Sequence, residues 1–209
     1  MNLYENYNNL TICKKDIDSA LLAMIETYKN GGKILLCGNG GSCADCEHIA
    51  GELLKGFLSC RPVSESFTRK LSEQGFSDAE FITKNLQGSL PAISLPSQSG
   101  IISAFANDVC PDMVYGQLVF GFAKPEDLLI CLSTSGNSKN AVYAAKVAKA
   151  MGVKPLALTG AKESKLSEIC DITIKVPETE TYKVQELHLP VYHYLCAEVE
   201  KYFFKECLL

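Results

Sequence analysis

Residues Cys37 to Phe57 read CGNGGSCADCEHIAGELLKGF, a stretch that follows a short apolar run at residues 33–36. The run predicts a buried strand, and a glycine-rich turn then leads into a helix from about Ser42. A strand that passes through such a turn into a helix N-terminus suits an anion, because free N–H groups and the helix dipole favour negative charge. The turn has neither the G-x-G-x-x-G spacing of a dinucleotide site nor the Gly-Lys-Ser/Thr ending of a Walker loop. We therefore expect an anion site outside those two nucleotide-binding classes.

His48 and Glu52 are four residues apart in the helix that follows this turn, so they share one helix face. An imidazole and a carboxylate on one face can bind a metal ion together or share a proton transfer. A pair with this spacing is also common as a surface ion pair. We keep both interpretations, and the position just beyond a glycine-rich turn raises the weight of the functional one.

The composition excludes several classes of protein. The chain has 209 residues, a formal net charge of −4 and a pI near 5.5, which gives no electrostatic basis for binding nucleic acid or an anionic membrane. No apolar run reaches the roughly 18 residues needed to span a bilayer. The polar N-terminal sequence lacks the apolar core of a signal peptide. We therefore expect a cytoplasmic protein with neither a nucleic-acid nor a membrane partner.

The ten cysteines do not suggest a disulfide framework, which is typical of small secreted chains. Cys37, Cys131 and Cys196 fall inside apolar runs, where a reduced cysteine behaves as a small hydrophobic residue. Cys43 and Cys46 form a C-x-x-C pair at the start of the predicted helix, where a thiolate would be stabilised. A structural zinc site would need a second such pair, and a redox pair remains open, but we favour two unpaired helix cysteines.

Strands and helices are predicted to alternate along the chain. Expected strands cover residues 33–37, 92–95, 127–132, 154–159 and 172–176. Expected helices cover residues 14–30, about 42–58, 99–106, 113–122, the stretch after 138 to about 151, about 162–169 and about 184–204. This order predicts an α/β fold, a three-layer α/β/α sandwich of flavodoxin-like type with a five-stranded, mostly parallel sheet. We expect a single domain over residues 1–209.

Residues 61–90 interrupt this alternation. They are polar and carry one short helical pattern, which begins near Ser77. A loop of this length inside a compact domain is usually functional or disordered. We interpret it as an inserted segment.

A second turn repeats the arrangement of the first. The strand at residues 127–132 leads into S-T-S-G-N-S, residues 133–138, and then into an Ala/Lys-rich helix. Its hydroxyl groups and free backbone N–H groups could enclose a phosphate monoester. The alternative is an ordinary helix N-cap, and we favour the phosphate. In a parallel sheet the two turns should meet at one crevice.

The last predicted helix carries Gln185, Glu186, His188 and His193. We interpret His188 as structural. Gln185 and His193 are eight residues apart, about 12 Å along a straight helix. If both bind one metal ion, they need long reaches or an irregular first turn, or they come from different subunits.

G-N-G-G-S, S-T-S-G-N-S and V-Q-E-L-H-L-P-V-Y-H together resemble the sugar isomerase (SIS) domain family, and within it the phosphoheptose isomerases. The resemblance covers nearly the whole chain except residues 61–90. It implies isomerisation of sedoheptulose 7-phosphate to D-glycero-D-manno-heptose 7-phosphate through an enediol, with Glu52 and His193 moving protons. It implies zinc held by His48, Glu52, Gln185 and His193. The substrate-binding residues that it implies are Asn39, Gly40, Gly41, Ser42, Asn107, Asp108, Ser133, Thr134, Ser135, Ser138 and Gln185. It also implies a homotetramer with sites at subunit interfaces, for which a dimer is the alternative.

Two departures from the family pattern concern the substrate. The family has a short connection where this chain has residues 61–90, and Tyr182 stands where some members have Asp. An isomerase of another phosphosugar is therefore one alternative. A non-catalytic SIS protein that binds the replication initiator DnaA is a second, but such relatives lack the acid/base pair. A regulatory sugar-phosphate sensor is a third alternative. Such sensors usually carry an attached DNA-binding domain, and we expect 209 residues to leave no room for one beside this domain.

Overall fold

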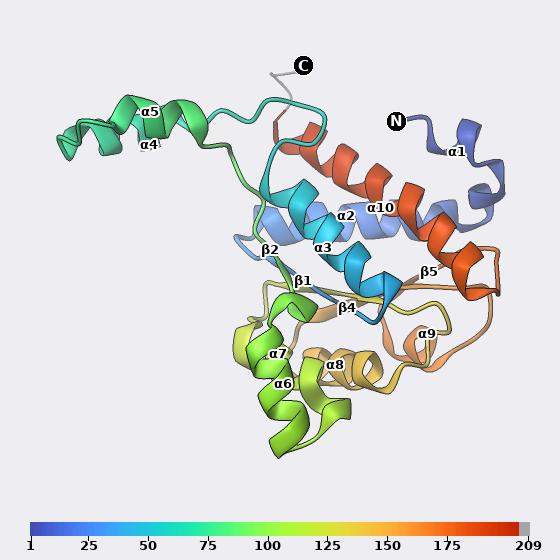
Figure 1. Ribbon diagram of the computed structural model, residues 1–209. Coiled ribbons are helices and arrows are strands. Elements are labelled where there is room, and N and C mark those ends of the chain that lie inside the picture. The colour runs from blue at the N-terminus through green and yellow to red at the C-terminus, as the bar shows by residue number, and fades with distance from the viewer. Residues whose placement is uncertain (205–209) are drawn as a thin grey trace.

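A five-stranded parallel sheet forms the centre of the computed structural model, which describes residues 1–204 (Figure 1). The strands lie in the order β2-β1-β3-β4-β5. Their bounds are β1 Ile34–Gly38, β2 Ala92–Ser94, β3 Leu128–Leu132, β4 Lys154–Thr159 and β5 Ile172–Lys175. All four strand pairings are parallel. This order is the flavodoxin-like one, so the predicted fold class is confirmed.

Helices cover both faces of the sheet (Figure 1). One layer contains α1 (Leu3–Asn6), α2 (Lys14–Lys29), α3 (Gly41–Leu54) and α10 (Thr181–Phe203). The other contains α6 (Ser99–Asp108), α7 (Val114–Phe122), α8 (Lys139–Ala150) and α9 (Lys165–Ile169). Short 3-10 turns lie at η1 (Asn8–Cys13), η2 (Leu95–Ser97) and η3 (Pro111–Met113).

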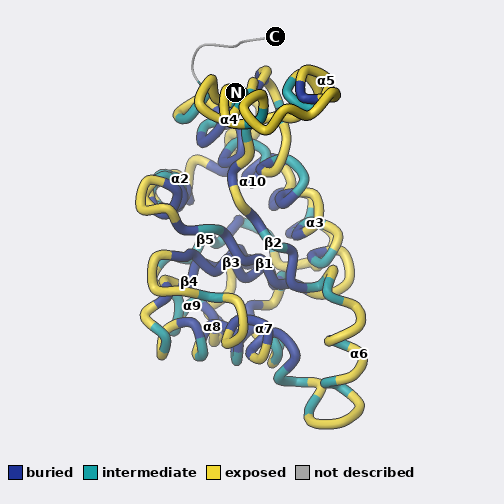
Figure 2. The backbone as a smooth tube through the Cα atoms, turned by 90° about the vertical axis from the view of Figure 1, so that its left-hand side faces the viewer, coloured by how far each residue is buried: buried dark blue, intermediate teal, exposed yellow. Residues whose placement is uncertain are grey.

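The apolar runs form strands because their side chains are buried on both faces. Along β1, Ile34 and Leu36 pack into the core beneath α2, α3 and α10, whereas Leu35 and Cys37 pack toward α7 and α8. Successive strand side chains point to opposite faces, so a strand covered on both faces needs apolar residues at every position. Figure 2 shows the strands buried between the two helical layers.

The two predicted loops end neighbouring strands. Gly38 at the end of β1 is paired with Leu132 at the end of β3. The chain leaves β1 toward β2 on one side, while β3 lies on the other, and ligands of such sheets bind where the connections diverge. Both loops are therefore side by side at the site that the topology favours.

The inserted segment forms an arm, which we define as residues 61–88. It contains α4 (Glu65–Glu73) and α5 (Ala79–Asn85), which contact each other and project from the body (Figure 1). No residue of α4 is buried, and Phe76 and Phe81 are exposed (Figure 2). The helical pattern expected near Ser77 corresponds to α5, whereas α4 was not predicted.

The boundaries of several helices differ from the sequence-based expectation. α3 ends at Leu54 and not at Leu58, because Lys55 is extended, with φ −132° and ψ 174°. α10 begins at Thr181, three residues before the expected start, and α6 continues to Asp108 instead of ending before Asn107. None of the helices within residues 1–204 combines the length and apolar character that a membrane span requires.

Candidate active site

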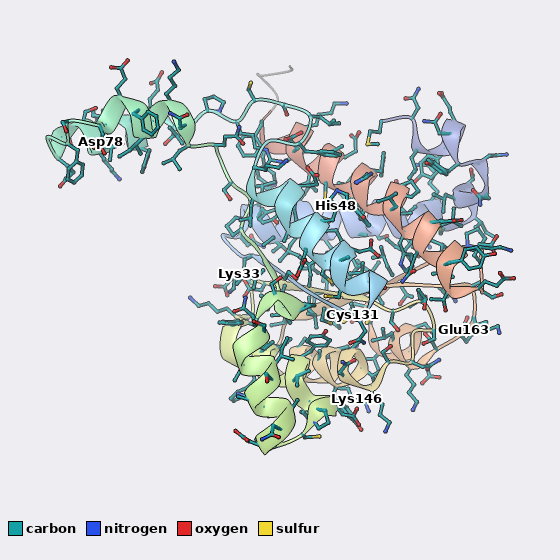
Figure 3. The ribbon with its side chains drawn as sticks, viewed as in Figure 1. Lys33, His48, Asp78, Cys131, Lys146 and Glu163 are labelled. Carbon is teal, nitrogen blue, oxygen red and sulfur yellow. The ribbon has the colours of Figure 1, made fainter. Side chains whose placement is uncertain are left out.

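Three of the predicted site residues meet where α3 packs beside α10, and we call His48, Glu52 and His193 the seam cluster. His48 Nε2 lies 3.3 Å from Glu52 Oε1 and 3.4 Å from His193 Nε2. Figure 3 labels His48 on α3. The His48 side chain is 43% exposed and that of Glu52 13%. Two imidazoles and a carboxylate thus converge within one chain at a place that a ligand can reach.

Two residues that the sequence analysis missed orient His48. The Tyr192 hydroxyl donates to Asp45 Oδ1 at 3.2 Å and lies 3.0 Å from His48 Nδ1. Because its one proton goes to Asp45, the hydroxyl can only accept from His48, which puts the imidazole proton on Nδ1. The other ring nitrogen, His48 Nε2, then faces Glu52 and His193. Asp45, His48 and Glu52 do lie on one face of α3, and that spacing was the available signal.

The surroundings of His193 favour its neutral form. Burial lowers the pKa of His193, and the neighbouring His48 lowers it further, while Glu52 acts in the opposite direction. His193 is therefore neutral at pH 7. A neutral imidazole can bind a metal ion through one nitrogen or donate its N–H to an oxygen.

In the first loop, the glycine backbone lies close to the side chain of Gln185 on α10. Gly40 has a φ of +57°, a conformation that L residues rarely adopt. A Cβ on Gly41 would lie 2.5 Å from Gln185 Nε2, so a side chain at this position would displace the end of the Gln185 side chain. Ser42 is buried in the first turn of α3. The first loop and Gln185 are thus adjacent.

The second loop is built from hydroxyl groups that bond to one another. Ser133 Oγ lies 3.1 Å from Ser138 Oγ, and Ser135 Oγ accepts from the backbone N–H of Asn137 at 3.2 Å. Thr134 and Ser135 also line a hollow of about 180 Å³. The hydroxyl groups of the second loop therefore lie within one turn between β3 and α8.

A reciprocal amide pair joins the first loop to the start of α8. Asn39 Nδ2 donates to Asn140 Oδ1, and Asn140 Nδ2 donates to Asn39 Oδ1, both at 2.9 Å. The buried Tyr115 donates to Gly38 O at 2.6 Å. These contacts fix the first loop relative to the start of α8.

Other predicted residues lie apart from the seam cluster. Asn107 and Asp108 form a 2.8 Å hydrogen bond at the end of α6, in the opposite helical layer. Gln185 lies against Gly41, about two turns of α10 away from His193. Within one chain, neither group completes the seam cluster.

The remaining histidine and the C-x-x-C pair have structural surroundings. His188 is fully buried with Nε2 3.4 Å from Thr159 O, and burial lowers its pKa to about 4. Cys43 and Cys46 are free thiols, in line with the favoured interpretation. Burial raises the pKa of Cys43, and Glu47 raises it further. Both effects favour the protonated thiol at Cys43.

A complete metal centre is not preformed in this part of the chain. Among residues 1–204, no group of three or more His, Cys, Asp or Glu side chains is arranged to hold a metal ion. The seam cluster nevertheless offers donor atoms of the right kind. Two ligand atoms of a tetrahedral zinc ion lie about 3.3 Å apart when the metal–nitrogen bond is about 2.0–2.1 Å, close to the separations around His48.

The chain is similar to known sugar-phosphate enzymes over most of its length. Two family models described as SIS domain match residues 103–196 and 10–85. The phosphoheptose isomerases of Aliarcobacter butzleri and Aneurinibacillus thermoaerophilus are 36% and 35% identical, each over 90% of this chain and over 85% and 82% of their own. A solved structure of phosphoheptose isomerase from Neisseria gonorrhoeae matches with a TM-score of 0.75 at 28% identity, covering 94% of this chain and 91% of that one. This chain therefore belongs to the SIS domain family and, within it, to the phosphoheptose isomerase family.

Proposed function

We propose that this protein is an aldose–ketose isomerase that converts sedoheptulose 7-phosphate into D-glycero-D-manno-heptose 7-phosphate. The observation that carries the proposal is the seam cluster, whose α3 residues lie about two to three helical turns beyond the first loop. Its relatives named phosphoheptose isomerase support the choice of sugar.

The reaction moves a proton between C1 and C2 of the open-chain sugar through an enediol. Glu52 is the base that takes the carbon-bound proton, because a carboxylate in hydrogen-bond reach of the substrate can serve as a general base. His193 is neutral at pH 7 through its lowered pKa, so its N–H can donate to a substrate oxygen as charge develops there. Tyr192 and Asp45 hold His48 in one tautomer beside both groups.

The nitrogen and oxygen donors of the seam cluster suit zinc. Gln185, the fourth ligand that the resemblance implies, lies about two turns of α10 away from His193 and does not reach the ion within one chain. His48, Glu52 and His193 would hold the ion. Bound zinc would polarise the carbonyl and hydroxyl oxygens of the sugar. Elemental analysis of the purified protein, with a His193→Asn variant as the comparison, tests the assignment: equal zinc in both proteins contradicts it.

The two loops hold the other end of the substrate. Backbone N–H groups near Gly40 and hydroxyls of Ser133, Ser135 and Ser138 would surround the phosphate. The binding energy of the phosphate then orients the reacting carbons. The loops thereby lower the activation barrier although they do not contact C1 or C2.

Incubation of the protein with sedoheptulose 7-phosphate tests the proposal. The expected result is the aldose heptose 7-phosphate, detected by mass-matched chromatography against an authentic standard. Shorter ketose phosphates in the same panel test the second candidate, which Tyr182 and the arm favour because both depart from the family pattern. If no ketose phosphate in the panel yields a product, the remaining interpretation is a non-catalytic binding protein.

We further propose a homotetramer, with a dimer as the alternative, in which sites are shared between subunits. The distance of Gln185 from His193, and of Asn107 from the seam cluster, supports contributions from a second chain. Sedimentation measures the assembly. A mixture of inactive Glu52→Gln and Asn107→Ala proteins should regain part of the activity, and a fully active monomer contradicts the idea. The cytoplasm remains the expected compartment.

A further inference from the structure

Arg61 is a buried arginine at the root of the arm. It is 1% exposed and lies between the end of α3 and the last turns of α10. Its guanidinium donates from Nε to Glu200 Oε1 at 2.7 Å, from Nη1 to Leu53 O at 2.6 Å and from Nη2 to Glu52 O at 2.9 Å. One side chain thus contacts α10 and the backbone of the proposed catalytic base.

Glu200 completes a closed polar network around this arginine. Its two carboxylate oxygens accept from the backbone N–H groups of Phe57 and Leu58, each at 2.7 Å. Burial raises the pKa of Glu200, but these bonds and Arg61 lower it by more, so the net shift is downward. A buried ion pair is costly unless its remaining hydrogen-bonding atoms are satisfied. Here the connection that follows α3 supplies those partners.

The contact with α3 falls where a helix needs partners. The last four carbonyls of a helix have no intrahelical donor, and the negative end of the helix dipole favours a cation. Arg61 supplies both a cation and two donors to the final turn of α3. Glu52 belongs to that turn, so its Cα is held relative to α10, which carries His193.

We propose that Arg61 is a positioning residue for Glu52, acting with Glu200 as its anchor on α10. The inference rests on the proposed function, in which Glu52 is the base. It assigns a role at the reacting end of the site to a residue whose side chain does not face the substrate. Displacement of a catalytic group by about 1 Å can reduce turnover about 100-fold.

Arg61 also ties the arm to this position. Its carbonyl accepts from Gly88 N, and Pro62 pairs with Gln87 in an isolated antiparallel bridge. Gln87 Oε1 in turn accepts from Gly56 N at 2.8 Å. The first and last residues of the arm are therefore connected to the segment that follows Glu52.

The test is a double variant, Arg61→Met with Glu200→Gln, which removes both charges and keeps an acceptor for the backbone. Replacing a buried pair as a unit avoids an unpaired buried charge. We expect kcat to fall about 10- to 100-fold, while KM for the sugar phosphate stays within about twofold because the phosphate loops are untouched.

The matched control is Lys33→Met with Asp127→Asn, a second ion pair with a buried carboxylate, which lies at the starts of β1 and β3, away from the two loops. This variant should lose stability without losing kcat. Wild-type kcat in the Arg61 double variant overturns the proposal, as does an equal loss of kcat in the control, which would indicate a general effect of stability.

Arg61→Lys is the second variant should the double variant fail to fold. Lysine keeps the charge beside Glu200 but places its donors on one nitrogen, so it cannot repeat the three-way contact. We expect a loss of kcat of at least about fivefold and faster hydrogen exchange in residues 52–58; unchanged kcat and exchange overturn the proposal. A Glu52→Gln protein in the same assay separates the two claims. If Glu52→Gln stays active, the proposed base is wrong; if it is inactive while both Arg61 variants are fully active, the positioning role alone is wrong.

Discussion

The seam cluster and the pair of loops consist of different kinds of chemical group. The seam cluster consists of titratable side chains on two long helices, and its geometry depends on how α3 packs against α10. The loops consist of glycine backbone and small hydroxyl or amide side chains at the ends of two paired strands. Proton transfer needs groups that titrate, whereas a phosphate needs many fixed donors of no particular pKa.

This difference assigns separate kinetic roles to the two regions. Damage to the seam cluster should reduce kcat, and damage to the loops should weaken binding. The amide pair of Asn39 and Asn140 ties the first loop to the start of α8, directly after the second loop, and neither residue belongs to the seam cluster. The two regions can therefore be changed independently.

The largest effect is expected from Glu52→Gln, which keeps size and removes the base. Turnover should fall about 1,000-fold, within the range for general base catalysis, while binding of sugar phosphate persists. Steady-state kinetics and calorimetry measure the two quantities. Glu47→Gln, the same change on the exposed side of α3, is the control. More than a tenth of wild-type activity in Glu52→Gln would remove this residue from the mechanism.

The complementary change is made in the second loop. Replacing Ser133, Ser135 and Ser138 together by Ala removes hydrogen bonds to a charged group, each worth about 1.5–3 kcal/mol. Binding of inorganic phosphate or substrate should weaken at least about 100-fold in calorimetry, with the fold retained. A triple alanine variant of arm serines serves as the control, made at Ser66, Ser72 and Ser77. Unchanged phosphate affinity would show that the loop is only a helix cap.

A third prediction concerns His188, the buried histidine of α10, and the pH dependence of folding stability. Burial lowers the pKa of His188 to about 4 in the folded protein. Below about pH 6.5 this histidine is therefore protonated in the unfolded chain while it stays neutral in the folded one. Stability is therefore complete above pH 6.5 and decreases toward pH 4. The wild-type protein should lose about 2 kcal/mol more than His188→Gln between pH 7 and pH 5, measured by urea unfolding. Parallel losses in both proteins would contradict the buried, neutral state.

The smallest expected effect comes from Tyr192→Phe, which removes the hydroxyl between Asp45 and His48. Loss of an orienting partner typically costs about 10-fold or more in activity, so we expect kcat to fall about 10-fold with binding unchanged. Tyr194→Phe is the control, because that ring packs against Tyr4. An unchanged ¹⁵N spectrum for the His48 ring would show that another group sets its tautomer.

The sheet could be predicted because its strands are buried on both faces. Apolar runs such as the one at residues 33–36 have no other stable place in a chain of this size, and their boundaries lie within about two residues of the observed ones. α4 was not predicted, because it is short, packs no residue into the core and carries only two apolar side chains, Phe67 and Leu71, on one face. The end of α3 was also missed, because its hydrogen-bond partners lie outside the helix, Arg61 at the Leu53 carbonyl and Gln87 at the Gly56 N–H.

The candidate site was only partly accessible from sequence. His48 and Glu52 could be paired by helical spacing, but His193 entered through family resemblance, and its distance from His48 depends on the packing of two helices. Tyr192 has no signal of its own in the sequence, and the face of α3 that Asp45 shares with His48 and Glu52 was overlooked. Their link arises only when α10 is laid beside α3. The roles of Asn107, Asp108 and Gln185 stay predictions.

The arm leaves the body and returns to it at one point, where Pro62 pairs with Gln87 and Gly88 N bonds to Arg61 O. A segment whose ends are already joined can change in length without displacing what surrounds it. Lineages can therefore lengthen, shorten or exchange residues 63–86 while the catalytic body is inherited unchanged. For an engineer, the same closure makes the turn at Gly75 a natural graft point for a reporter sequence.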